Sequence, residues 1–344
     1  MDSPLLAEPG AVPAEAPDAG VAAHYGDPYG EQRGTMASFG VVDASHRDVI
    51  RITGPDRLSW LHSLTTQHLE RLAPGDSAEA LILDPQGRVE HQLSLTDDGE
   101  ATWVHVEAGA AASLLEFLTS MRFMLRVETA DVSAEYAVLT ILGPDAAAHP
   151  VPGAAATVRD ELETIVIIPR GRLADEVAAL REAGATLAGT WAHEALRIAA
   201  GRPRMGLDTD HRAIPHELGW IDTAVHLSKG CYRGQETVAR VHNLGHPPRR
   251  LVLLHLDGSE DRLSAHGDLV QLEDAEVGFV GSAARHYELG PIALALVKRT
   301  VPVDATLLAD GLPAAQEVLV PPDAGANVQV TFRRPRGDLI GRGR

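Results

Sequence analysis

The chain has 344 residues, of which 44% are hydrophobic and 23% charged, a composition typical of a globular protein with two or three domains. Its formal net charge of −18 works against direct binding to nucleic acid or to an anionic membrane. No apolar run approaches the roughly 20 residues that span a bilayer, and the N-terminus lacks a basic region followed by an apolar one, so we expect a cytoplasmic protein.

Both ends of the chain are expected to be disordered tails. Residues 1–20 are rich in Pro, Ala, Gly and acidic side chains and offer little to bury. Residues 333–344 form the one basic segment, rich in Arg and Gly. The structured part is therefore predicted to run from residue 21 to residue 332.

The first structural elements follow a clear hydrophobic pattern. Residues 49–53 alternate as a strand, Gly54-Pro55 stops it, and a helix capped by Asp56 begins. Residues 79–95 predict a hairpin around the turn Asp84-Pro85-Gln86-Gly87. Further strands are predicted at 102–106, 136–145 and 164–169, and helices at 111–121, 172–184 and 188–201. This mixture predicts an α+β region over residues 21–244.

The pattern changes near residue 245. From there the chain consists of short apolar stretches separated by Gly, Pro and Asp, which predicts a small β-barrel or sandwich over residues 245–332. Pro247-Pro248 marks the boundary.

Cys231 is the only cysteine of the chain and lies in the segment SKGCYRGQE, residues 228–236. Two glycines predict a loop, and residues 235–242 predict a helix directly after it. A helix N-terminus and the cations of Lys229 and Arg233 would favour the thiolate and lower the thiol pKa. The alternative is a small buried hydrophobic residue.

The motif Lys-Gly-Cys-Tyr-Arg-Gly-Gln-Glu at 229–236 resembles the signature of the YgfZ family, folate-binding proteins related to the aminomethyltransferase (T-protein) of the glycine cleavage system. Segments 24–32, 39–56 and 194–219 are also similar to these proteins. The resemblance implies a T-protein-like cloverleaf, in which two α+β lobes and a C-terminal β-barrel surround a folate-sized opening.

The resemblance also implies a function. YgfZ-like proteins support the assembly or repair of iron–sulfur enzymes, one of which modifies tRNA, so the expected partners are iron–sulfur proteins or their assembly factors. Cys231 and Lys229 are the expected catalytic residues. Tetrahydrofolate or a related folate is the expected cofactor, bound by Tyr232, Arg233, Gly234, Gln235, Glu236 and Arg197.

Two positions depart from the relatives. T-protein has an acidic pair on the strand after the turn, where this chain has His91 and Gln92, and the neighbouring Glu90 is expected on the opposite face. Glycine-cleavage chemistry is therefore predicted to be lost. Ala199 stands where the relatives carry an acid that is expected to hold the pterin, which predicts weak folate binding. A folate-dependent one-carbon transferase and a non-catalytic adaptor remain as alternatives.

Residues 208–217 concentrate Asp, His and Glu, but no metal-binding spacing such as His-Glu-x-x-His occurs. We interpret the segment as a polar surface loop and expect no metal site. Trp191 and Trp220 are expected to anchor the core.

Overall fold

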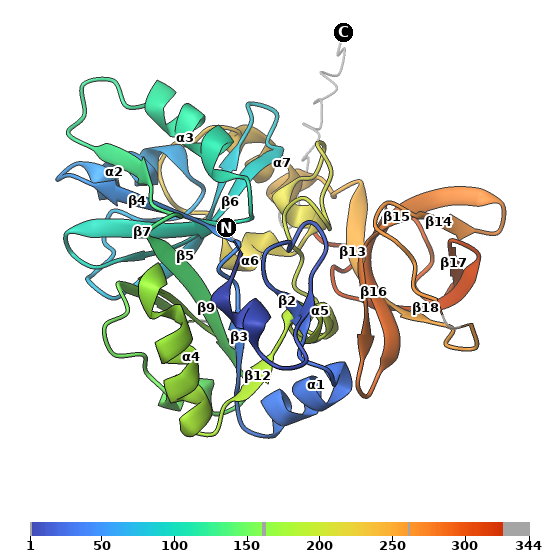
Figure 1. Ribbon diagram of the computed structural model, residues 1–344. Coiled ribbons are helices and arrows are strands. Elements are labelled where there is room, and N and C mark those ends of the chain that lie inside the picture. The colour runs from blue at the N-terminus through green and yellow to red at the C-terminus, as the bar shows by residue number, and fades with distance from the viewer. Residues whose placement is uncertain (1, 160–162, 261, 326–344) are drawn as a thin grey trace, which may run out of the picture.

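The computed structural model describes residues 2–159, 163–260 and 262–325; the predicted tail at 333–344 lies outside this part. Two five-stranded sheets and a closed six-stranded barrel are joined by helices (Figure 1). The predicted α+β class and the C-terminal barrel are therefore confirmed.

The first sheet has the strand order β5-β6-β7-β4-β8, all antiparallel. Its strands are β4 (Asp48–Thr53), β5 (Ser77–Leu83), β6 (Val89–Asp97), β7 (Ala101–Val106) and β8 (Glu128–Asp131). Helices α2 (Arg57–Leu64) and α3 (Ala111–Ser120) pack their apolar side chains on one face. The predicted hairpin is β5–β6, closed by a bond from the Gly87 amide to the Asp84 carbonyl.

The second sheet has the order β10-β11-β9-β3-β12, in which only β12 and β3 run parallel. Its strands are β3 (Gly40–Asp43), β9 (Tyr136–Leu142), β10 (Ala156–Arg159), β11 (Glu163–Pro169) and β12 (Thr186–Ala188). The central strand β9 is almost wholly apolar because both of its faces are covered. Leu139 and Ile141 pack toward α4 (Leu173–Glu182), while Val138 packs with Val49 and Trp103 of the first sheet.

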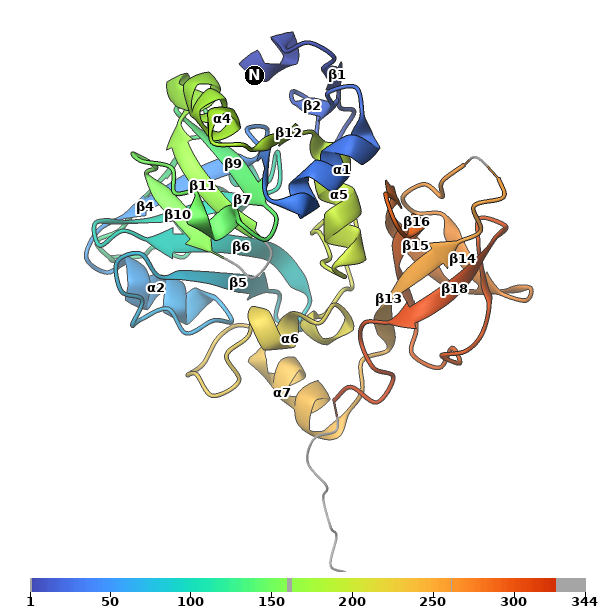
Figure 2. The same cartoon turned by 90° about the horizontal axis from the view of Figure 1, so that it is seen from below.

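The barrel closes in the order β13-β16-β15-β14-β17-β18 and is filled by small and branched apolar side chains. Its strands are β13 (Arg249–Leu256), β14 (Leu269–Leu272), β15 (Ala275–His286), β16 (Gly290–Lys298), β17 (Leu307–Ala309) and β18 (Leu312–Val318). Figure 2 shows α5, α6 and α7 between the two sheets and the barrel.

The remaining helices are α1 (Pro28–Ala37), α5 (Thr190–Ala199), α6 (Trp220–Thr223) and α7 (Gln235–Leu244). Short 3-10 turns occur at η1 (Pro4–Ala7), η2 (Ala146–Ala148), η3 (Arg170–Arg172) and η4 (Pro215–Glu217). An apolar cluster joins α5, α6 and α7 to β5 and to the barrel strands β13 and β16. Trp220 is buried in it as expected, whereas Trp191 is 54% exposed, so the prediction for Trp191 is wrong.

Residues 2–20 are ordered, and the prediction of a disordered N-terminal tail is wrong for them. Leu5 is buried against the second sheet and α4, and the short strands β1 (Val12–Pro13) and β2 (Ala22–His24) pair with each other. Asp18 is buried and bonds to the guanidinium of Arg204 at 2.9 Å. The segment is thus held by Leu5, by the ion pair of Asp18 and by the bond from the Ser3 hydroxyl to Asp43.

Candidate functional site

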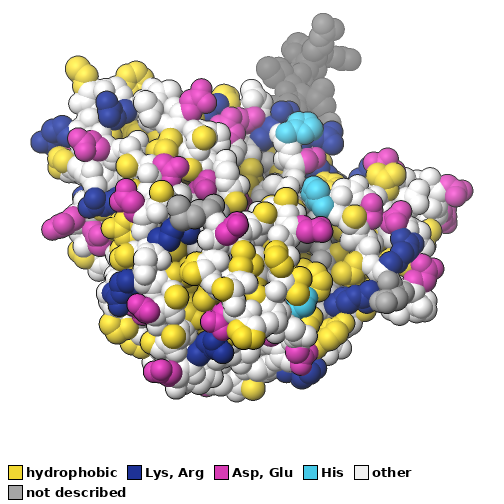
Figure 3. All heavy atoms as spheres, viewed as in Figure 1, with side chains coloured by type: hydrophobic (Ala, Val, Ile, Leu, Met, Phe, Trp, Pro, Cys, Tyr) yellow, Lys and Arg dark blue, Asp and Glu magenta, His cyan; other side chains and the backbone are white. Residues whose placement is uncertain are grey.

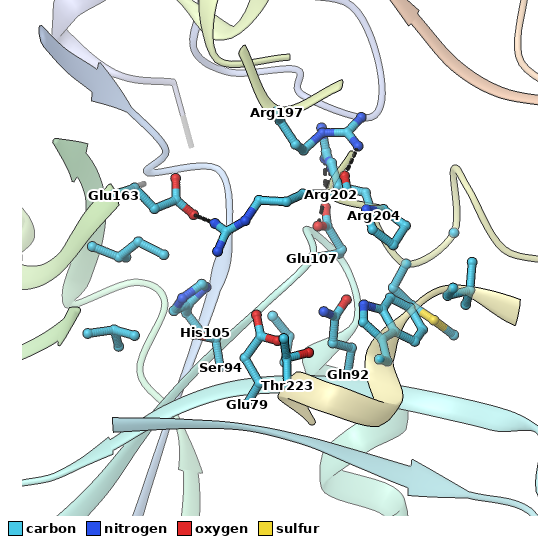
Figure 4. Close-up of a pocket in the computed structure, with 18 of the residues that line it drawn as sticks. Glu79, Gln92, Ser94, His105, Glu107, Glu163, Arg197, Arg202, Arg204 and Thr223 are labelled. Carbon is cyan, nitrogen blue, oxygen red and sulfur yellow. Dashed lines mark hydrogen bonds and ion pairs between the residues drawn. The ribbon is translucent and has the colours of Figure 1, made fainter. Parts of the chain in front are cut away.

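A cavity of about 760 Å³ lies where the two sheets meet the segment after α5 and helix α6 (Figure 4). Strands β5, β6 and β7 supply one wall, and β9, β10 and β11 supply the facing wall. The side chains that bring hydrogen-bonding or charged groups to it include Glu79, Gln92, Ser94, His105, Glu107, Glu163, Arg202 and Thr223. Charged and polar side chains thus make up much of the lining, together with apolar residues such as Val138 and Ile165.

Arg204 fixes one side of the cavity. Its guanidinium is buried and bonds to Glu107 at 2.6 Å, to Glu194 at 2.8 Å and to Asp18 at 2.9 Å. Burial alone would lower the pKa of Arg204, but the charges of Glu194 and Glu107 raise it above its usual value. These bonds join the N-terminal segment, the residue after β7 and α5 at one wall of the cavity.

Arg197, which the sequence assigns to ligand binding, lines the cavity but is also paired on several sides. It donates to Glu194 at 2.6 Å, to Asp208 at 2.9 Å and to the Ser282 hydroxyl of the barrel at 2.9 Å. Its guanidinium therefore holds α5 to the barrel.

Glu163 faces the cavity from β11. It accepts from His193 at 3.1 Å and from Arg202 at 3.5 Å. Burial raises the pKa of its carboxyl, but the hydrogen bond from His193 and the charges of His193, Arg202 and Arg47 lower it to about 2. Glu163 is therefore ionised at neutral pH.

His105 differs from Arg204, Arg197 and Glu163 in its hydrogen bonding. Its side chain is buried and points into the cavity from β7, and neither ring nitrogen has a hydrogen-bond partner among the described residues. Burial lowers the pKa of His105 to about 4, with the nearby charge of Arg47 adding to the effect. At neutral pH the ring is uncharged, and protein atoms enclose both of its nitrogens.

The cysteine loop lies just before α7, as predicted, and Cys231 is exposed. Gly234 caps the helix with φ +81°, and a Cβ there would lie 2.6 Å from the Asp84 carbonyl oxygen. The motif therefore packs directly against the turn of the β5–β6 hairpin, whose second strand continues into the cavity wall.

The two cations beside Cys231 have other partners. The Lys229 ammonium donates to the carbonyls of His62, Thr65 and Gln67, at and just after the end of α2. Burial lowers the pKa of Lys229 to about 8. Arg233 bonds to Glu90 at 2.8 Å. The structure thus assigns both side chains to holding the loop in place, whereas the sequence had assigned them to the thiol and its ligand.

Glu90 lines the cavity together with His91 and Gln92, so its expected position on the opposite face is wrong. The register explains the difference: Ile82 pairs with His91 but Leu83 pairs with Val89, which leaves Glu90 as the extra residue of a β-bulge. The bulge breaks the strict alternation on which the prediction relied.

The predicted ligand-binding residues do not all lie at the cavity. Among them, Arg197 lines the cavity, while Arg233 reaches it through Glu90. Gln235 accepts from the Tyr232 amide at 3.1 Å within the loop, and Glu236 is exposed at the start of α7.

Ala199, the position expected to weaken folate binding, packs against the apolar cluster between α5 and the barrel. The cavity nevertheless has carboxylates at Glu79, Glu107 and Glu163. Glu107 and Glu163 already accept from arginine or histidine side chains, so weak folate binding stays a prediction.

Residues 208–217 are not a surface loop as expected, since Asp208, His216 and Glu217 are buried. Arg249 of the barrel pairs with Asp210 at 2.7 Å and with Glu217 at 2.8 Å. The acidic residues of this segment thus bind arginines of α5 and the barrel.

Elsewhere, His62, His68 and Glu70 bring three ligand atoms within 4.8 Å of one another. However, Nδ1 of His62 accepts the Leu69 amide, and the positive charge of Lys229 lies close enough to lower the pKa of His62, although burial is the larger cause. Both features oppose a cation, and we assign no metal to this cluster.

The fold belongs to a recognisable class. The glycine cleavage system aminomethyltransferase T of Bartonella henselae superposes with a TM-score of 0.77 at 19% identity, covering 92% of this chain and 96% of that protein. The predicted T-protein-like cloverleaf is confirmed.

Sequence comparison agrees with this relationship. The model of the GCVT N-terminal domain matches residues 24–149. A putative chloroplastic transferase of Arabidopsis thaliana is 27% identical over 73% of this chain and 65% of its own length. A mitochondrial iron–sulfur cluster assembly factor IBA57 homolog of Mycosarcoma maydis is 26% identical over 67% of this chain and 61% of its own length. The chain is therefore related to GCVT-domain proteins, and it spans somewhat less than two thirds of these two relatives.

Among the described residues, no helix is both long enough and apolar enough to cross a bilayer.

Proposed function

We propose that the protein supports the assembly or repair of iron–sulfur enzymes, as a YgfZ-like protein would, with Cys231 as its working group beside a folate-type ligand in the cavity. The observation that carries the proposal is the placement of the lone cysteine. It is exposed, and its loop is tied to the cavity wall through Arg233 and Glu90. An exposed thiol on a fixed loop can reach a partner while the cavity is occupied.

The cavity supports the folate part of the proposal. Its volume of about 760 Å³ lies in the range of small-molecule sites. The carboxylates of Glu79 and Glu163 can accept N–H groups of a pterin ring, and Arg47 and Arg202 bring positive charge for a carboxylate tail.

The iron–sulfur part rests on the relationship to the fungal assembly factor and on the resemblance of the cysteine motif to the YgfZ signature. Any effect on tRNA modification then runs through an iron–sulfur enzyme. On the face in Figure 3, acidic and basic side chains are interspersed, which suits contact with protein partners better than contact with nucleic acid. The cytoplasmic location stays a prediction.

One-carbon transfer, the alternative that the fold permits, is less well supported. The strand positions where T-protein carries its acidic pair hold His91 and Gln92, and the nearest acid, Glu90, is paired with Arg233. A pure adaptor is also less well supported, because docking alone needs no cavity of about 760 Å³ between the two sheets.

The test has two parts. The purified protein should bind 5-formyltetrahydrofolate, a stable reduced folate, in titration calorimetry. The wild-type gene should restore iron–sulfur enzyme activity in a bacterial strain that lacks its own YgfZ-like protein. If the protein does not bind the folate, the proposed ligand is wrong. If the gene does not restore enzyme activity, the proposed iron–sulfur role is wrong.

A further inference from the structure

A second cavity, of about 570 Å³, lies where the N-terminal segment, α1 and α5 face the barrel (Figure 2). We call it the barrel-side cavity. Among the described residues, it has no lining residue in common with the central cavity between the two sheets. Its volume lies in the range of small-molecule sites. Much of its wall is apolar and includes Ala14, Pro17, Pro28, Leu207, Leu263 and Ala283.

Hydrogen bonds between the helices and the barrel hold the walls of this cavity in place. The side-chain amide of Gln32 on α1 donates to the Arg285 carbonyl and accepts from the Tyr287 amide, both at 3.0 Å. Arg197 of α5 donates to the Ser282 hydroxyl at 2.9 Å. Because Gln32, Ser282 and Arg285 line the cavity, its walls are fixed before a ligand arrives, which lowers the free-energy cost of binding.

Two exposed aromatic side chains line the barrel-side cavity. Trp191 of α5 is 54% exposed and Tyr29 of α1 is 40% exposed, whereas the other three tryptophans of the chain are buried. The His24 ring lies 4.9 Å from the Trp191 ring and restricts the indole on one side. A single exposed aromatic residue is ordinary. Two of them at one cavity offer ring faces on which a flat apolar ligand can pack.

The polar atoms at the cavity favour a ligand that carries a hydrogen-bond donor. Nδ1 of His266 lies 2.9 Å from a backbone carbonyl oxygen of β15. Because a carbonyl only accepts, Nδ1 carries the proton, and Nε2 of the neutral ring is left as an acceptor. The exposed carboxylate of Glu15, also on the wall, only accepts as well.

The charges of the wall disfavour an anionic ligand. The carboxylates of Asp18 and Glu194 line the cavity together with Glu15, against one arginine, Arg285. Asp18 and Glu194 already accept from Arg204, so they do not call for a cationic ligand either. An uncharged ligand therefore suits the wall best.

We propose that the barrel-side cavity binds an uncharged, flat aromatic molecule with a hydroxyl or N–H donor, whose ring packs on Trp191 and whose donor bonds to Nε2 of His266. The proposal does not depend on the proposed iron–sulfur function, because no residue of the central cavity takes part. It also gives a physical reason for the exposed indole of Trp191, which the sequence had placed in the core.

The test is a titration of the full-length, ¹⁵N-labelled protein with 1-naphthol, an uncharged flat ring with one hydroxyl donor, followed through the indole N–H signals in two-dimensional NMR spectra. The chain has four tryptophans, and replacing each with phenylalanine assigns its signal. The Trp191 signal should shift saturably. Trp220 lines the central cavity and reports binding there. A shift of Trp220 without one of Trp191, or no shift of either at millimolar naphthol, would overturn the proposal.

Titration calorimetry on variants separates the ring contact from the donor contact. Trp191→Leu should weaken naphthol binding roughly tenfold, and its melting temperature should stay close to that of wild type because the side chain is exposed. His266→Leu should weaken binding roughly two- to tenfold. It should also abolish the preference of the wild type for naphthol over 1-methoxynaphthalene, which lacks the donor.

Phe123→Leu is the matched control, because it removes an exposed aromatic ring outside the cavity and should bind naphthol as wild type does. Wild-type affinity in Trp191→Leu would overturn the proposed site. Equal binding of the two naphthalenes by the wild type would overturn the role assigned to His266.

Discussion

Lys229 shows how one side chain can serve a motif without acting on its reactive atom. Its ammonium donates to three backbone carbonyls at and just after the end of α2, where helix carbonyls lack intrahelical partners. Lysine at this position therefore joins the cysteine loop to the first sheet and its helices. The sequence shows Lys229 two positions before Cys231 but cannot show where its ammonium points.

Replacing Lys229 with methionine should therefore destabilise the protein. The variant leaves three carbonyls without their donor, which we expect to lower the free energy of unfolding by ~1–3 kcal/mol in urea titrations. Lys298→Met is the matched control, because Lys298 is exposed and donates to one carbonyl. Equal stability of the two variants would show that Lys229 does not anchor the loop.

His105 should make the protein sensitive to acid. Its pKa is about 4 in the folded protein and 6.5 in the reference state, so between these values the unfolded chain binds a proton that the folded chain does not. Stability is then fully present above pH 6.5 and falls toward pH 4. The neighbouring charges of Arg47, Glu107 and Glu163 belong to this environment.

Urea unfolding at pH 7 and pH 4.5 measures this effect. His105→Leu should lose less stability on acidification than wild type, by up to ~3 kcal/mol. Glu163 and Glu194 contribute losses mainly below pH 4.5, since their carboxyl pKa values are about 2. Parallel acid losses in wild type and variant would rule out the assigned role of His105.

At the scale of elements, much of the regular structure was predictable. The hairpin, the helices after residues 110, 172 and 189, and the barrel follow from local pattern and turn chemistry. The N-terminal segment was not predictable, because its main anchor is Asp18, which binds an arginine 186 positions away. Its composition, rich in Pro, Ala and acid, carries no signal of that contact.

Substitution of Arg204, which links several elements, should therefore lower the stability strongly. Arg204→Met removes one partner from three carboxylates, the buried Asp18 and the half-buried Glu107 and Glu194, and should cost ~3–5 kcal/mol of stability in urea unfolding. Arg181→Ala, which breaks a more exposed ion pair to Glu8 of the same N-terminal segment, should cost less than ~1 kcal/mol. If the two variants lose similar amounts of stability, the ion pairs of Arg204 do not hold these elements together.

At the scale of the whole molecule, the cavity exists because two sheets and the connection to the barrel converge. One of its walls comes from three strands, β5, β6 and β7, and His105 lies in the stretch TWVHV, where nothing local distinguishes it from a core position. The cysteine loop could be located from the sequence because the loop, its glycines and the helix after it are adjacent in the chain. The sequence singled out Arg197, His91 and Gln92 of the cavity lining but missed Glu163 and His105, which only the pairing of distant strands brings there.

The central claim is that the exposed thiol of Cys231 is the working group. Cys231→Ser is close in size to the wild type and affects no core contact, so its stability should stay within ~0.5 kcal/mol of wild type. Ser228→Ala, on the same exposed loop, is the control.

The most direct measurement is iron–sulfur enzyme activity in a strain that lacks its YgfZ-like protein and expresses wild type, Cys231→Ser or Ser228→Ala at matched levels. Wild type and Ser228→Ala should restore activity, and Cys231→Ser should not. Full restoration by Cys231→Ser would contradict the account.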